Sequence, residues 1–256
     1  MKFNSIVKSL ALTAGLVASF TSSAEFLDFE VNESVYSNGN ASVVADKLNG
    51  SYFEELVFDG TGGFSTGAFA HMTSLIANDG TTPVNTSVLG VNVGGLGYAM
   101  YAVLTATGVA DPTQTEFFAT NATFNLYIDP SFDTTSDDLL NGTVSDVSGD
   151  DILIGSASAV TNAYGQYDNG TGNFNFDFTD FALTAEGELY FVSPEPFYSY
   201  VTVNGDFDTL GNLPRITGDV SANFLATPVN VPEPSTVAVL ALGLVGLGMS
   251  ARRKNK

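Results

Sequence analysis

Apolar and polar residues alternate along several short segments in the middle of the chain. Residues 123–129 place Phe124, Leu126 and Ile128 on one face, and residues 173–178 alternate three phenylalanines with asparagine and aspartate. A period of two residues is what a strand with one buried face requires. We therefore predict a half-buried β-strand at each of these segments.

Other segments rich in β-branched and aromatic residues lie between turn sequences such as Asn204-Gly205 and also indicate strands. Their ranges are 26–31, 52–58, 63–70, 98–105, 152–160, 181–184, 188–192, 198–203 and 216–225. Residues 71–77 fit either a helical turn or a continued strand, and the polar, acidic residues 131–151 fit a long loop. About ten to thirteen short strands at this spacing predict an all-β ectodomain, folded as an antiparallel β-sandwich or jelly roll.

The first 24 residues have the three parts of a secretory signal peptide. Lys2 and Lys8 give a positive start, residues 10–20 are apolar, and Ser22-Ser23-Ala24 supplies small residues at the end. An apolar core of this length is too short to span a membrane as a helix. We predict export with cleavage between Ala24 and Glu25, and an uncleaved anchor is the alternative.

The C-terminal residues carry a different order of parts. Pro232-Glu233-Pro234 precedes the uncharged, apolar residues 237–249, and Arg252, Arg253 and Lys254 follow. At about 1.5 Å of rise per residue the apolar segment makes a helix of roughly 20 Å, shorter than a hydrocarbon core of about 30 Å. The sequence therefore predicts one C-terminal apolar helix, with the basic residues as a stop on the cytoplasmic side.

This order of Pro-Glu-Pro, apolar helix and basic tail resembles the PEP-CTERM sorting signal that bacterial exosortases recognise. The resemblance implies an exosortase as partner, a transient tether in the inner membrane, and processing near Pro232-Glu233-Pro234. A plain membrane anchor is the alternative. The chain then divides into a signal peptide (1–24), a β-sandwich ectodomain (25–226), a linker (227–231) and a sorting tail (232–256).

A second set of motifs lies within residues 40–226. It includes Gly95-Leu96-Gly97-Tyr98, Phe124-Asn125-Leu126-Tyr127-Ile128-Asp129 and Tyr190-Phe191-Val192-Ser193-Pro194. Together these motifs resemble the flocculation-associated PEP-CTERM proteins. The resemblance implies a cell-surface or extracellular-matrix protein of a Gram-negative bacterium that supports aggregation with exopolysaccharide. The alternative function is a carbohydrate-binding, lectin-like module with a defined sugar pocket.

The charge of the predicted ectodomain narrows its partners. Between Glu25 and Val231 the chain has 27 acidic residues and two basic ones, Lys47 and Arg215, which gives a formal net charge of −25. This charge repels nucleic acid and anionic lipid headgroups, so we expect neither as a partner. The chain has no Cys. The fold therefore depends on core burial rather than disulfides, and Cys-based metal sites and nucleophiles are excluded.

One short motif matches a catalytic pattern. Residues 63–67 read Gly-Phe-Ser-Thr-Gly, the Gly-x-Ser-x-Gly nucleophile pattern, but the single histidine, His71, follows Ser65 by six residues. That mechanism needs a sharp strand-to-helix turn at the serine, and an Asp and a His later in the chain. Glycines within a β-strand explain the match better, and we expect an ordinary packed or surface role for His71.

Acidic pairs are the other catalytic candidates. Glu54, Glu55, Glu186 and Glu188 could in principle supply the two acids that glycoside hydrolysis requires. Adjacent acids on a strand point to opposite faces, so Glu54 and Glu55 do not form such a pair. We therefore predict that the protein is not an enzyme and has no catalytic residue.

Aspartates gather in the predicted loop that begins near residue 129. Calcium prefers oxygen ligands, and the calcium candidates are Asp129, Asp133, Asp137 and Asp138, with Asp146, Asp150 and Asp151 farther along. The EF-hand pattern and the nonapeptide repeat pattern are both absent from this sequence. A solvated acidic loop without a cofactor is therefore the favoured interpretation, and a calcium site is the alternative.

Overall fold

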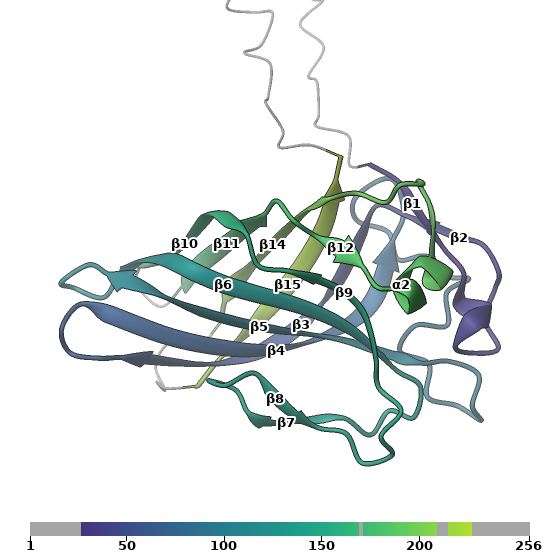
Figure 1. Ribbon diagram of the computed structural model, residues 1–256, viewed down its shortest axis with the longest axis horizontal. Helices are drawn as coiled ribbons and strands as arrows, with labels where there is room; N and C mark the ends of the chain where they lie inside the picture. The colour runs from purple at the N-terminus through teal and green to yellow at the C-terminus, as the bar shows by residue number, and fades with distance from the viewer. Residues whose placement is uncertain (1–26, 169–170, 209–214, 227–256) are drawn as a thin grey trace, which may run out of the picture. The chain divides into compact units, whose positions relative to one another are not determined.

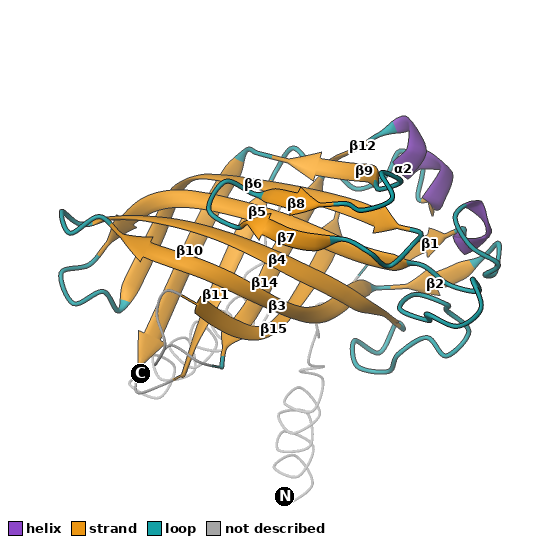
Figure 2. Ribbon diagram, turned by 90° about the horizontal axis from the view of Figure 1, so that it is seen from below, coloured by secondary structure: helices purple, strands orange, loops and turns teal. Residues whose placement is uncertain are grey.

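Eight antiparallel strands pair in sequence until the last one meets the first, which closes them into a barrel (Figures 1 and 2). β15 pairs with β3 along Arg215–Asn223, whereas β6 and β10 pair only over residues 116–118 and 164–166. In order around the barrel the strands are β3 (Lys47–Phe58), β4 (Gly63–Ile76), β5 (Ala99–Ala110), β6 (Glu116–Asp129), β10 (Val160–Asp168), β11 (Thr171–Phe178), β14 (Tyr200–Phe207) and β15 (Arg215–Leu225).

The computed structural model describes residues 27–168, 171–208 and 215–226. The predicted signal peptide, its cleavage site at Ala24 and Glu25, the linker, the Pro-Glu-Pro motif and the apolar helix with its basic stop lie outside these residues. Within the described ranges, no helix combines the length and the apolar character that crossing a membrane requires.

The barrel corrects the prediction of a β-sandwich or jelly roll, which is wrong. Alternating segments such as Phe124–Ile128 and Phe174–Phe178 do form strands with one buried face. That alternation is the same in a sandwich and in a barrel, because both bury one side of each strand. The feature that separates the two folds is the pairing of β6 with β10, and it joins residues almost 50 positions apart.

A small three-stranded sheet packs against the end of β15. It consists of β1 (Phe29–Val31), β2 (Val43–Ala45) and β13 (Phe191–Ser193). The short helix η1 (Glu33–Val35) lies between β1 and β2, and the helix α2 (Ala185–Tyr190) directly precedes β13. The ring of Phe224 on β15 lies 5.4 Å from the rings of Phe29 and Phe191. Residues 188–192 were predicted as a strand, but residues 188–190 belong to the helix α2 and the strand β13 begins only at Phe191. The Thr184 hydroxyl caps the helix by accepting the Gly187 N–H at 3.0 Å.

Residues 131–151, predicted as a loop, contain a hairpin of β7 (Thr135–Asp138) and β8 (Thr143–Ser145) before β9 (Ile152–Ala157), which pairs with β6 and with β12 (Ala182–Leu183). The hairpin turn packs Leu139 against Phe69 and Tyr101 on the outer face of the barrel. Gly67 makes this approach possible, because a Cβ at that position would lie 1.7 Å from the Leu139 carbonyl oxygen. Close packing therefore explains the second glycine of the Gly-x-Ser-x-Gly match.

We expect Gly67→Ala to lower the free energy of unfolding by about 1–3 kcal/mol, the range for overpacked sites, and to speed hydrogen exchange in β7 and β8. Ser65→Ala is the matched control, because Ser65 lies on the same outer face of β4 but is exposed. Urea unfolding and amide exchange of both variants measure the effect. Equal stabilities for the two variants would contradict this account of Gly67.

Candidate functional site

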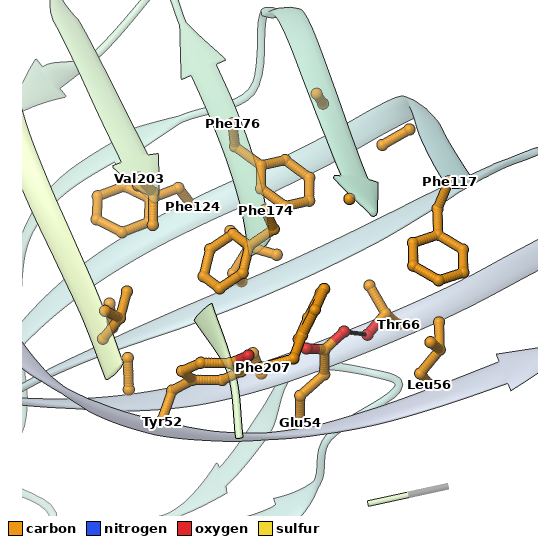
Figure 3. A pocket seen from close by; sticks show the side chains of 18 of the residues that line it. Tyr52, Glu54, Leu56, Thr66, Phe117, Phe124, Phe174, Phe176, Val203 and Phe207 are labelled. Atoms are coloured by element: carbon orange, nitrogen blue, oxygen red, sulfur yellow. Dashed lines mark hydrogen bonds between the residues drawn. The ribbon is translucent and has the colours of Figure 1, made fainter. Parts of the chain in front are cut away.

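A cavity of about 50 Å³ lies inside the barrel, and all eight barrel strands contribute to its lining (Figure 3). Alanines on β4, β5, β6 and β10 leave the space, and phenylalanines form most of the remaining wall. The phenylalanines are Phe64, Phe117, Phe124, Phe174, Phe176 and Phe207. The lining residues with a side-chain oxygen are Tyr52, Glu54, Thr66 and Tyr164. The interior is thus an apolar chamber with one carboxyl group.

Glu54 lies in this chamber because it shares the inner face of β3 with Tyr52 and Leu56. The Thr66 hydroxyl hydrogen-bonds to Glu54 Oε1 and also lies 2.9 Å from the main-chain carbonyl oxygen of Glu55. The Thr66 hydroxyl is thus the hydrogen-bond donor to the Glu54 carboxyl. This hydrogen bond orients the carboxyl without supplying a positive charge.

Burial dominates the charge state of this carboxyl. Burial raises the pKa of the Glu54 carboxyl to about 7, and the Thr66 hydroxyl opposes the rise. The side chain is 9% exposed, and the described residues that line the cavity include no Lys, Arg or His to stabilise a carboxylate. Desolvation without a charged partner disfavours the ionised form. Glu54 therefore changes its charge near neutral pH inside an apolar chamber.

Ser65 and His71 do not form a catalytic pair. Both lie on the outer face of the continuous strand β4, so the turn that a nucleophile of this type needs is missing. Six residues of strand separate the two side chains by about 20 Å. His71 instead packs against Phe69, with ring centroids 4.8 Å apart, and desolvation lowers the pKa of its imidazole.

The glutamates considered for glycoside hydrolysis do not form a catalytic pair either. Glu55 projects from the outer face of β3 while Glu54 points inward, as the alternation predicted. Glu186 and Glu188 are exposed on α2, away from the residues that line the cavity. The structure therefore places the four glutamates in three different environments.

Five aspartates between β6 and β9 lie close together. Carboxylate oxygens of Asp129, Asp133 and Asp150 lie within 4.8 Å of one another, and so do those of Asp146, Asp150 and Asp151. Asp129 Oδ1 accepts the N–H groups of Ser131 and Phe132 at 2.9 and 2.6 Å, which fixes the chain around the cluster. Asp133 Oδ1 and Asp151 Oδ1 are buried without a hydrogen-bond partner. The cluster thus has oxygens that a cation would satisfy.

Two of the four predicted calcium ligands belong to this cluster and two do not. Asp129 and Asp133 are members, whereas Asp137 and Asp138 are exposed on β7. The Asp138 carboxylate instead accepts the Asn141 side-chain amide at 2.7 Å. Asp150 and Asp151 come into the cluster because the chain returns through the β7–β8 hairpin, which sequence spacing does not reveal.

A polar groove crosses the outer face of the barrel on the side of β10, β11, β14 and β15. Strand register sets Tyr164 beside Asn175, Asn175 beside Asn204, and Asn204 beside Ser221. Within the part of the chain that the structure describes, the side chains of Asn175 and Asn204 make no hydrogen bond. The polar residues of the groove are Tyr164, Asn173, Asn175, Asn204, Asp206, Asp219 and Ser221.

Sequence reasoning missed the cavity and the groove. The spacing of Tyr52, Glu54 and Leu56 contains the signal for Glu54, because residues two apart in a strand share a face. The groove has no comparable signal, since its asparagines come from separate strands and meet only through their register.

We expect the stability of the protein to fall as pH rises through the pKa of Glu54. The folded state holds the Glu54 proton up to about pH 7, whereas the unfolded chain releases it near the ordinary pKa of 4.5. Between these two pH values the folded state therefore binds more protons than the unfolded chain. The contribution of the protonated Glu54 to the free energy of unfolding is fully present below pH 4.5 and is lost as the pH rises through 7. The pKa difference corresponds to about 3 kcal/mol.

Glu54→Gln isolates this effect from the other acids. Relative to the wild type, this variant should gain about 3 kcal/mol in free energy of unfolding between pH 4.5 and pH 8, measured by urea denaturation. Glu55→Gln on the outer face is the control and should keep the wild-type pH profile. Parallel profiles for wild type and Glu54→Gln would show that Glu54 does not titrate in this range.

The C-terminal tail matches a known sorting motif in sequence. A family model described as the PEP-CTERM protein-sorting motif matches residues 230–254, which include Pro232-Glu233-Pro234 and the basic residues Arg252, Arg253 and Lys254. Comparison with curated proteins and with solved structures gives no match. The resemblance of residues 40–226 to flocculation-associated proteins stays a prediction. The chain carries a PEP-CTERM sorting motif, which marks it as an exported, surface-directed protein that an exosortase processes from a membrane-anchored intermediate.

Proposed function

We propose that this exported protein works at the surface, or in the extracellular matrix, of a Gram-negative bacterium, where it binds exopolysaccharide and supports cell aggregation. The polar groove on the outer face of the barrel is the observation that carries the proposal. The proposed role is binding, and it includes no catalytic step. Release from the inner membrane by an exosortase would free the barrel to reach the polymer outside the cell.

The groove has the chemistry that a sugar chain requires. The side chains of Asn173, Asn175 and Asn204 offer both N–H donors and carbonyl acceptors, which match the hydroxyl groups of sugars. Tyr164, 37% exposed, adds an aromatic face with a polar tip at one side of the groove. Because the polar row continues across several strands, it supports contact with an extended chain.

The acidic composition of the protein restricts the charge of the polysaccharide that it can bind directly. A formal charge of −25 between Glu25 and Val231 repels polyanions over long distances at low salt. A neutral polysaccharide binds without this penalty, and an acidic one requires cations between the two surfaces. The sign of the charge therefore favours a neutral polymer for direct contact with the groove.

We expect the double substitution Asn175→Ala and Asn204→Ala to weaken binding to exopolysaccharide purified from the producing cells by about thirtyfold, because two amides at roughly 1 kcal/mol each are lost. Affinity electrophoresis measures the dissociation constant. Asn121→Ala is the control, since Asn121 is exposed on β6 outside the groove. Equal binding by both variants would remove the groove from the proposal.

The lectin-like alternative predicts a different result. A defined pocket for one sugar would give specific, saturable binding of a short oligosaccharide on a glycan array. An extended chain in an open groove gives affinity that rises with oligosaccharide length, because each added sugar meets another part of the row. Tight, length-independent binding of one short sugar would favour the lectin.

The aspartate cluster supports a second proposal, that a calcium ion binds between β6 and β9. Calcium takes six to eight oxygen ligands at about 2.3–2.6 Å, and Asp129, Asp133 and Asp150 supply carboxylates on one side of such a site. The unpartnered oxygens Asp133 Oδ1 and Asp151 Oδ1 are the specific observation in its favour, since a buried carboxylate oxygen without a partner is costly. The ion would brace the loop that carries the β7–β8 hairpin.

We expect calcium at about 100 times its dissociation constant to raise the melting temperature by about 5 °C or more relative to a chelator. Asp133→Asn should remove the calcium-dependent part of this rise, and the predicted but distant ligand Asp137→Asn should leave it unchanged. Differential scanning calorimetry with calcium, magnesium and chelator measures it. A rise that survives Asp133→Asn would exclude the cluster as the site.

A further inference from the structure

The barrel cavity has the size of a small molecule rather than of a lipid or a sugar. Its volume is about 50 Å³. A cavity needs about 10–15 Å³ to hold one water, and this space exceeds that minimum several times. A ligand of about four or five non-hydrogen atoms is small enough for it.

The hydrogen-bonding groups of the cavity call for a donor on the ligand. Glu54 Oε1 is occupied by Thr66, and no hydrogen bond reaches Glu54 Oε2 within the described residues. Tyr52 directs its hydroxyl to the Asp206 carbonyl oxygen at 2.9 Å, so this group is also occupied. The carboxyl oxygen Oε2 is therefore the acceptor that remains available inside the chamber.

The charge of the Glu54 carboxylate favours a ligand whose hydrogen-bond donor is a cation. No Lys, Arg or His occurs among the described residues that line the cavity, so a carboxylate there has no cation of its own. Faces of aromatic rings attract cations, and six phenylalanines surround the space. We propose that the barrel interior binds a small apolar primary amine, with its ammonium group on the Glu54 carboxylate and its alkyl chain among the phenylalanine rings.

The seam between β6 and β10 gives such a ligand a path. The two strands pair from Glu116 to Phe118, and no pairing joins them over residues 119–123 of β6. Ala119 and Ala163, on the two sides of this seam, both line the cavity. Small side chains and a short hydrogen-bonded contact make this the part of the wall that opens most easily. The cavity lies on the inner face of the strands and the groove on the outer face, and Tyr164, Phe174 and Val220 contribute to both.

Glu54 is the group that sets the pH dependence of this site. Tyr52 also lines the cavity, and burial raises the pKa of its phenol, so it stays neutral between pH 6 and pH 8. Charged residues on β3, β14 and β15 that point to the outer face include Glu55, Asp206, Arg215 and Asp219. An alkylamine stays protonated throughout this range. Its affinity should therefore follow the ionisation of Glu54.

The test uses three molecules of equal length on the purified full chain: n-butylamine, n-butanol and butyrate. NMR titration measures the dissociation constants. We expect saturable binding of n-butylamine at pH 8, weakened about tenfold at pH 6 because a carboxyl with a pKa of about 7 is then mostly protonated. n-Butanol should bind at least tenfold more weakly at pH 8, and butyrate should not saturate.

Three variants complete the test. Glu54→Gln should abolish both the preference for the amine and its pH dependence, and Glu55→Gln should keep both. Ala102→Leu should block binding by filling the cavity, while the unchanged fold is checked by circular dichroism. The proposal is overturned by equal binding of n-butylamine and n-butanol, by unchanged amine binding in Glu54→Gln, or by no saturable amine binding at pH 8.

Discussion

Closure of the sheet between β6 and β10 is the constraint on which the rest of the structure depends. This contact joins residues 116–118 to 164–166, and it converts an open sheet with two edges into a barrel with an inside and an outside. Closure pairs two strands, β6 and β10, whose exposed edges would otherwise invite pairing with other chains. It also decides which alternate residues lose contact with water. The apolar chamber around Glu54 exists only because this short seam completes the wall.

The same closure gives each strand two chemical environments. β3 directs Tyr52, Glu54 and Leu56 inward, while Ser51 and Glu55 face outward. The inner set lines an apolar chamber, and the outer set belongs to an acidic surface. Because register is fixed by the barrel, residues from separate strands, such as Asn175 and Asn204, meet in one row. Two sites of opposite polarity can thus share one wall.

Local patterns in the sequence predicted the strands but not their assembly. The alternation around Phe174 and Phe176 identified β11 and its buried face, because a period of two depends only on neighbouring residues. Barrel closure and the outer groove depend on pairings between distant strands, which no local pattern contains. The calcium candidates show the same limit: Asp129 and Asp133 lie in the cluster, and Asp137 and Asp138 turn away with the hairpin. The sorting tail was predictable because its order of parts is itself linear.

Glu54 lowers the stability of the barrel when its buried carboxyl group ionises. The chain has no Cys, so its folded state depends on core burial. A carboxyl group in that core lowers stability once it ionises, and a glutamine or an apolar side chain at the same position would avoid this loss. Residues that break the rules of a stable core are concentrated at functional sites, where stability is exchanged for activity. The position of the one carboxyl in the chamber, beside free space, therefore favours a binding role over a structural one.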